Sequence, residues 1–122
     1  MHLSTTTSHG PSSPGRPVNL DGLGRHGYGI GCHWTTWTLN ADGTQLPFER
    51  AVDEFDVRAF ANRVAETDAG HVLFTINHAL HWLVCPSHET DRVMPGRTCR
   101  RDLIRDLIDA LRGHGIALML YY

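Results

Sequence analysis

The sequence lacks the features that mark several large classes of protein. Its three cysteines, Cys32, Cys85 and Cys99, are too few and too odd in number for a disulfide framework, so we expect reduced thiols. The N-terminus has no cationic start followed by an apolar core, and no apolar run approaches the roughly 18 residues of a membrane span. We therefore expect a cytoplasmic protein that has no membrane partner.

The sequence also lacks an excess of charge of either sign. Its 11 Lys plus Arg stand against 13 Asp plus Glu, which gives a net charge of −2 with histidine neutral. This balance gives no electrostatic reason to expect nucleic acid as a partner. Histidine is abundant, and protonation of all 9 would change the charge from −2 to +7, so we expect solubility and ligand affinity to depend on pH below neutrality.

The N-terminal segment has little apolar content. Residues 1–20 are rich in Ser, Thr, Gly and Pro and cannot bury enough apolar surface to offset the entropy of ordering, so we expect a flexible tail. Gly22–Gly27 fits the G-x-G-x-x-G dinucleotide pattern, but that pattern binds a cofactor only between a strand and a helix. No strand is expected before it, and we therefore expect no cofactor.

Three apolar segments predict strands: Tyr28–Trp34, Val72–Ile76 and Ile116–Tyr122. The second is an unbroken apolar run, which is typical of a parallel strand covered on both faces. The first two end in similar side chains, with His33 and Trp34 after one and Asn77, His78, His81 and Trp82 after the other. Because parallel sheets of α/β folds bind ligands at the carboxyl ends of their strands, this is where we expect a site.

Two amphipathic helices separate these strands. The first is about a dozen residues long, with Asp56 as its N-cap and Gly70 as its end, and the second runs from about Arg101 to Gly113. We expect loops before Phe55 and over Pro86–Arg97, because both stretches are rich in polar and turn-forming residues.

The expected order of tail, β, α, β, α, β indicates an α/β fold with a parallel sheet. The 122 residues are about half of the roughly 250 that a complete β/α barrel needs. Three strands leave unpaired backbone groups at a sheet edge, so we expect poor solubility and self-association through that open edge.

Four motifs in this order resemble the start of the α-L-fucosidase family, glycoside hydrolase family 29. Residues 28–35 (YGIGCHWT) resemble the family strand F-G-I-F-x-H-W-G, and residues 72–87 resemble V-V-L-T-x-K-H-H-D-G-F-x-L-W-P-S. Phe55-Asp56 followed by Phe60 is similar to the start of the family's first helix. Residues 101–122 resemble a segment that begins R-D-L-V-x-E-L and ends G-L-Y-Y-S.

The resemblance implies that residues 21–122 are the N-terminal portion, about three β/α units, of an incomplete (β/α)8 TIM barrel. It implies a parent enzyme that hydrolyses α-L-fucosyl (deoxysugar) bonds with retention, and a carbohydrate substrate as partner. The family nucleophile is an Asp after a later strand, so we expect no catalytic residue before Tyr122 and no hydrolase activity from this segment. The candidate substrate-binding residues are His33, Trp34, His78, His81 and Trp82.

Two alternatives remain open. One is a truncated, non-catalytic relative that binds carbohydrate without hydrolysing it. The other is a zinc-binding protein that uses His78-x-x-His81 and Cys85-x-x-His88, with Cys99 nearby, because zinc accepts such nitrogen and sulfur ligands. That pattern is loose, no second C-x-x-C pair completes it, and we therefore expect no metal.

Overall fold

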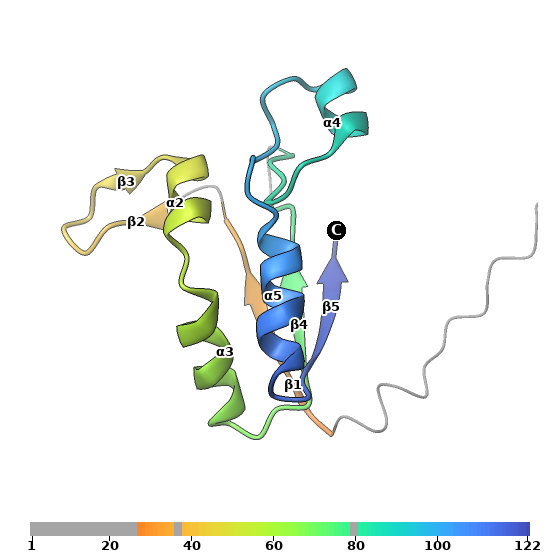
Figure 1. Cartoon of the computed structure of the whole chain (residues 1–122). Coiled ribbons are helices and arrows are strands. Elements are labelled where there is room, and N and C mark those ends of the chain that lie inside the picture. Colours follow the sequence, from red (N-terminus) through yellow and green to blue (C-terminus); the bar gives the residue numbers. More distant parts are fainter. Residues whose placement is uncertain (1–26, 36–37, 79–80) are drawn as a thin grey trace, which may run out of the picture.

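The computed structural model describes residues 27–35, 38–78 and 81–122, and the flexible tail predicted at 1–20 lies outside them (Figure 1). The elements in chain order are β1 (Gly29–His33), β2 (Thr38–Leu39), β3 (Gln45–Leu46), α2 (Phe48–Glu54), α3 (Val57–Ala65), β4 (His71–Thr75), α4 (His88–Val93), α5 (Leu103–Arg112) and β5 (Ala117–Tyr121).

The three predicted strands are confirmed and form one parallel sheet in the order β1-β4-β5. The register aligns the carboxyl ends of the strands, so that His33 is opposite Thr75 and Thr75 is opposite Tyr121. α3 lies between β1 and β4 in the chain and α5 between β4 and β5, and both helices cover the same face of the sheet (Figure 1). This arrangement is that of the predicted α/β class.

The core lies between that face and the two helices. Val72 and Phe74 of β4 are 0% and 2% exposed, and they belong to one buried cluster with Leu103, Leu107 and Leu111 of α5. The three leucines are spaced four residues apart along α5, so they form the continuous apolar stripe that the sequence predicts.

The other face of the sheet is open in the described part of the chain. Leu73, between Val72 and Phe74, is 42% exposed, because successive side chains of a strand point to opposite faces. The expectation that this strand is covered on both faces is therefore wrong for the described residues. The unbroken apolar run did not reveal that both crossover helices lie on one side.

The helix starts agree with the sequence, and one helix end does not. Asp56 caps α3 by accepting hydrogen bonds from the backbone N–H groups of Arg58 and Ala59, and Asp102 caps α5 in the same way. α3 ends at Ala65 rather than at Gly70. Gly70 instead connects the starts of two strands, because its N–H donates to the carbonyl oxygen of Tyr28 and its carbonyl oxygen accepts from the N–H of Ala117.

Short elements occupy both expected loops. β2 and β3 form a hairpin around Asp42-Gly43, and α2 and α4 follow in the stretches predicted as irregular. Tertiary contacts stabilise α2: the Nη1 of Arg101 donates to the carbonyl oxygens of Val52, Asp53 and Phe55 at its C-terminal end. Among the described helices, none combines the length and apolar character needed to cross a membrane.

Candidate functional site

Two of the predicted site residues meet at the carboxyl edge of the sheet. His33 ends β1, and its Nδ1 lies 3.3 Å from the Oγ1 of Thr75, the last residue of β4. His78 follows β4, and its ring contacts that of His33 edge to face, with the centroids 5.3 Å apart and the planes at 77°. The strand register thus brings two imidazoles from distant parts of the sequence together.

A cavity of about 250 Å³ on the open face of the sheet is lined by His33, whereas His78 lies outside its described lining. We call it the edge pocket, and its described lining is Gly31, Cys32, His33, Leu73, Thr75 and Tyr121. Its lining combines the imidazole of His33 and the hydroxyl groups of Thr75 and Tyr121 with apolar surface from Leu73 and Gly31. A few convergent polar groups over an apolar surface are typical of small-ligand sites.

A larger hollow of about 420 Å³ lies between α5 and β5, lined by residues that include Ile108, Arg112 and Ile116. It contains residues at the amino end of β5, whereas His33 and Thr75 are at carboxyl ends. Its described lining has one charged group and no imidazole. Its chemistry therefore does not mark it as the ligand site, in spite of its size.

Trp34 belongs to the buried core cluster. Its side chain is only 9% exposed, and its ring packs against Phe55 at 5.2 Å and Phe74 at 6.1 Å between centroids. Its Nε1 is buried and makes no hydrogen bond to the described residues. In the described chain Trp34 therefore supports the end of β1 and does not line the edge pocket.

His81 and Trp82 also lie outside the described lining of the edge pocket. His81 is exposed, has a positive φ of 55°, and places its Nδ1 3.4 Å from the Nδ2 of Asn77. Trp82 packs against Phe48 of α2 at 5.1 Å, and the Arg97 guanidinium carbon lies 4.8 Å from the centre of its ring. These contacts make Trp82 part of the packing around α2.

Sequence reasoning missed Thr75 and Tyr121. Both occupy the register row of His33 and line the edge pocket, and Tyr121 is 58% exposed. The usable signal was the register itself: aligning the last residues of the three predicted strands would have placed these side chains beside His33.

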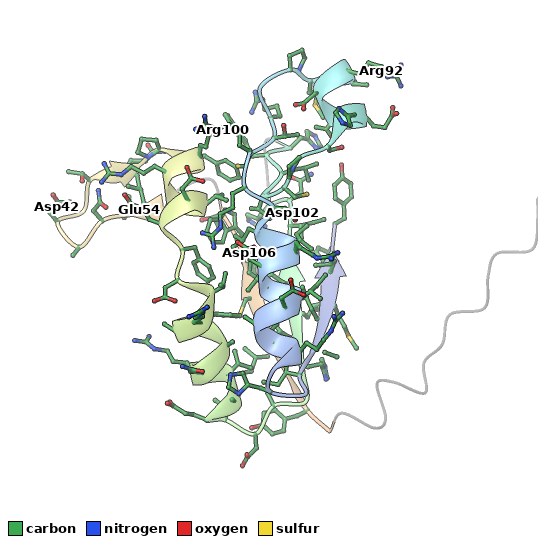
Figure 2. All side chains as sticks on the ribbon, in the orientation of Figure 1. Asp42, Glu54, Arg92, Arg100, Asp102 and Asp106 are labelled. Carbon is green, nitrogen blue, oxygen red and sulfur yellow. The ribbon has the colours of Figure 1, made fainter. Side chains whose placement is uncertain are left out.

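The edge pocket has no carboxylate in its described lining. The acidic residues labelled in Figure 2 belong to other elements, with Asp42 between β2 and β3, Glu54 in α2, and Asp102 and Asp106 at and after the cap of α5. The described pocket can therefore exchange hydrogen bonds with a ligand, but it offers no carboxylate nucleophile.

The cysteines do not form a metal site in the described residues. Burial raises the pKa of the Cys32 thiol. Burial, and to a smaller extent the negative charge of Asp102, raises the pKa of Cys85. Burial, followed by the negative charges of Glu49 and Asp53, raises the pKa of Cys99 to about 12. All three thiols are therefore protonated near neutrality in the absence of a metal ion. Residues 27–35, 38–78 and 81–122 contain no group of three or more His, Cys, Asp or Glu able to hold a metal ion, so the zinc alternative has no site among them.

No family model and no curated protein matches this chain. Solved structures do match it in fold. An α-L-fucosidase of glycoside hydrolase family 29 from Bacteroides thetaiotaomicron is 18% identical, with a TM-score of 0.61 over 97% of this chain and 32% of that one. A bacterial fucosidase bound to an inhibitor is 18% identical, with a TM-score of 0.62 over 91% of this chain and 30% of that one. The α-fucosidase of Thermotoga maritima, in complex with a mechanism-based inhibitor, is 19% identical, with a TM-score of 0.56 over 78% and 32%.

These likenesses establish first a class of fold: parallel α/β units like those in the matched structures. Within that class, the resemblance to α-L-fucosidases that the motifs indicate is confirmed at the level of structure. The chain spans about a third of the length of the structures it matches.

Proposed function

We propose that this chain is the N-terminal, sugar-binding portion of a (β/α)8 barrel, and that the whole barrel belongs to a fucosidase-like glycoside hydrolase. The whole protein would release α-L-fucosyl groups from glycans with retention. The order of the four motifs and the fold likeness to α-L-fucosidases support this proposal.

The observation that carries the proposal is the imidazole of His33 in the lining of the edge pocket, in ring contact with the imidazole of His78. A neutral imidazole has one donor and one acceptor nitrogen, so two of them can bind neighbouring hydroxyl groups of a sugar. Leu73 and Gly31 offer an apolar surface to the carbon skeleton of the ring. A pocket with these parts fits a small polyol with one apolar face.

Catalysis would depend on residues outside this segment. Retaining hydrolysis needs two carboxyl groups about 5–5.5 Å apart, one as nucleophile and one as acid and base. The described lining of the edge pocket has neither. In our proposal this segment binds and orients the sugar, the family resemblance assigns the nucleophile to a later strand, and the 122 residues alone do not turn over an aryl fucoside.

The absence of a carboxylate from the described lining also favours a second candidate, a carbohydrate-binding protein without hydrolase activity. The two candidates differ in what the whole reading frame encodes and does. Hydrolysis of an aryl fucoside by the protein expressed from the complete frame supports the enzyme, whereas sugar binding without turnover supports the second candidate.

Titration of the 15N-labelled chain with L-fucose tests the proposed site. We expect shifts in the signals of His33 and His78, and a rise in Kd of about tenfold or more for His33→Ala and His78→Ala, because about 1.4 kcal/mol of binding free energy corresponds to a factor of ten. His114→Ala is the matched control, since His114 is exposed and borders the amino end of β5. Absence of any L-fucose response, or equal losses for all three variants, would contradict the proposal.

A further inference from the structure

Thr75 is a buried polar residue beside the proposed sugar contact. It is the last residue of β4 and is 3% exposed, which makes it the one buried polar side chain in the described chain. The Oγ1 of Thr75 lies 3.3 Å from the Nδ1 of His33, and no other hydrogen bond of this oxygen is present among the described residues. The proposed function does not use Thr75 directly, so its role requires a separate explanation.

Two arrangements of protons fit this contact. In the first, the Thr75 hydroxyl donates to an unprotonated Nδ1, and His33 carries its proton on Nε2. In the second, Nδ1–H donates to Oγ1, and the hydroxyl proton has no acceptor among the described groups. Leaving a buried donor unsatisfied costs about 1–3 kcal/mol, so the first arrangement is favoured.

We infer that Thr75 is a positioning residue that holds His33 as the Nε2–H tautomer. The Thr75 hydroxyl binds the Nδ1 of His33, and the edge-to-face contact with His78 fixes the tilt of the His33 ring. The Nε2–H of His33 is then free to donate a hydrogen bond to a ligand. This inference rests on the proposed function, and it adds that His33 acts as a hydrogen-bond donor to a sugar hydroxyl oxygen rather than as an acceptor. Orientation of a functional histidine through its second nitrogen is a general property of such residues.

The tautomer is directly measurable on the chain itself. Long-range 1H–15N spectra at a pH where histidine is neutral distinguish Nε2–H from Nδ1–H, and the His33→Ala spectrum identifies the His33 signals. Free imidazole side chains already favour Nε2–H but retain a minority of the other form. We therefore expect that minority to be absent from wild type and from Thr75→Ser, and to appear in Thr75→Val, which keeps the β-branched shape without the hydroxyl.

The inference is overturned by an Nδ1–H population at His33 in the wild-type chain, a result that needs no variant to fold. It is also overturned if folded Thr75→Val, checked by circular dichroism, shows the wild-type tautomer signals. Titration with L-fucose separates this outcome from the proposed function: we expect Thr75→Val to raise Kd about threefold and Thr75→Ser to leave it unchanged. If Thr75→Val changes the tautomer of His33 but the wild-type chain does not bind L-fucose, only the proposed function is refuted. If the wild-type chain binds L-fucose through His33 but Thr75→Val leaves the tautomer unchanged, only this inference is refuted.

Discussion

The two faces of the sheet differ in what their side chains do. On the helix-covered face, Val72 and Phe74 pack beneath α5 and are almost completely buried. On the open face, Leu73 is 42% exposed and shares the edge pocket with His33 and Thr75. One strand, β4, contributes to both faces because its side chains alternate.

This difference separates stability from binding. The helix-covered face contains the fully buried leucines of α5, and the open face contains the polar groups that converge at the carboxyl edge. Substitutions on the first should lower the free energy of unfolding, whereas substitutions in the edge pocket on the second should change ligand binding with a smaller effect on stability.

The largest expected effect is on the helix-covered face. Leu107→Ala removes a side chain that is 0% exposed, and we expect it to lower the free energy of unfolding by about 2–5 kcal/mol, because a cavity is left in the core. Urea unfolding followed by circular dichroism measures the loss.

Leu73→Ala on the open face is the matched control for Leu107→Ala, and we expect it to cost less than about 1 kcal/mol. An equal cost for the two variants would break the comparison between the faces. It would indicate that self-association covers the open face, and a concentration-dependent unfolding midpoint would identify that cause.

Two glycines of β1 sharpen the comparison within the open face. A Cβ on Gly29 would overlap the ring of His71, whereas a Cβ on Gly31 would meet open space. We expect Gly29→Ala to cost about 1–3 kcal/mol of unfolding free energy as an overpacked site, and Gly31→Ala to be close to neutral. Adding His71→Ala to Gly29→Ala should recover most of the loss, and a double-mutant cycle without such coupling would disprove the steric cause.

The buried thiol of Cys99 should make the free energy of unfolding depend on pH. Cys99 is 3% exposed, and its pKa is raised from 9.0 to about 12, so the folded state keeps a proton that the unfolded state loses above about pH 9. Stability should therefore be fully present below that pH and fall by about 1.4 kcal/mol per pH unit between about pH 9 and 12. Urea unfolding at pH 8 and 10 measures this difference, and Cys99→Ala should reduce it. The same pH dependence in both proteins would show that Cys99 is not its source.

Sequence patterns predicted the parts of this structure that depend on local physics. The three strands, the cap Asp56 and the leucine stripe of α5 all follow from periodicity and capping, whereas the cap Asp102 was not predicted. α2 was missed because its stability depends on Arg101, which is 46 to 49 residues away from the carbonyl groups it binds. Local patterns do not contain such contacts.

The candidate site was predicted only in part. His33 and His78 could be proposed because each follows a predicted strand, and the structure brings them together. Trp34 follows a strand as well, but its indole packs between Phe55 and Phe74, a placement that depends on which side of the strand the helices cover. Residue type and strand position therefore indicated the edge of the sheet, but not the direction of each side chain.

The effect on stability at His33 should be smaller than that at Leu107. His33 is exposed, but His33→Ala also removes the acceptor of the buried Thr75 hydroxyl, so we expect it to lower the free energy of unfolding by about 1 kcal/mol while it removes the proposed sugar contact. Comparing the change in unfolding free energy with the change in Kd for L-fucose, for both His33→Ala and Leu107→Ala, tests the division between the faces directly. A His33→Ala protein as unstable as Leu107→Ala would show that the carboxyl edge also stabilises the fold. That result would remove the basis for treating the two faces as separate in function.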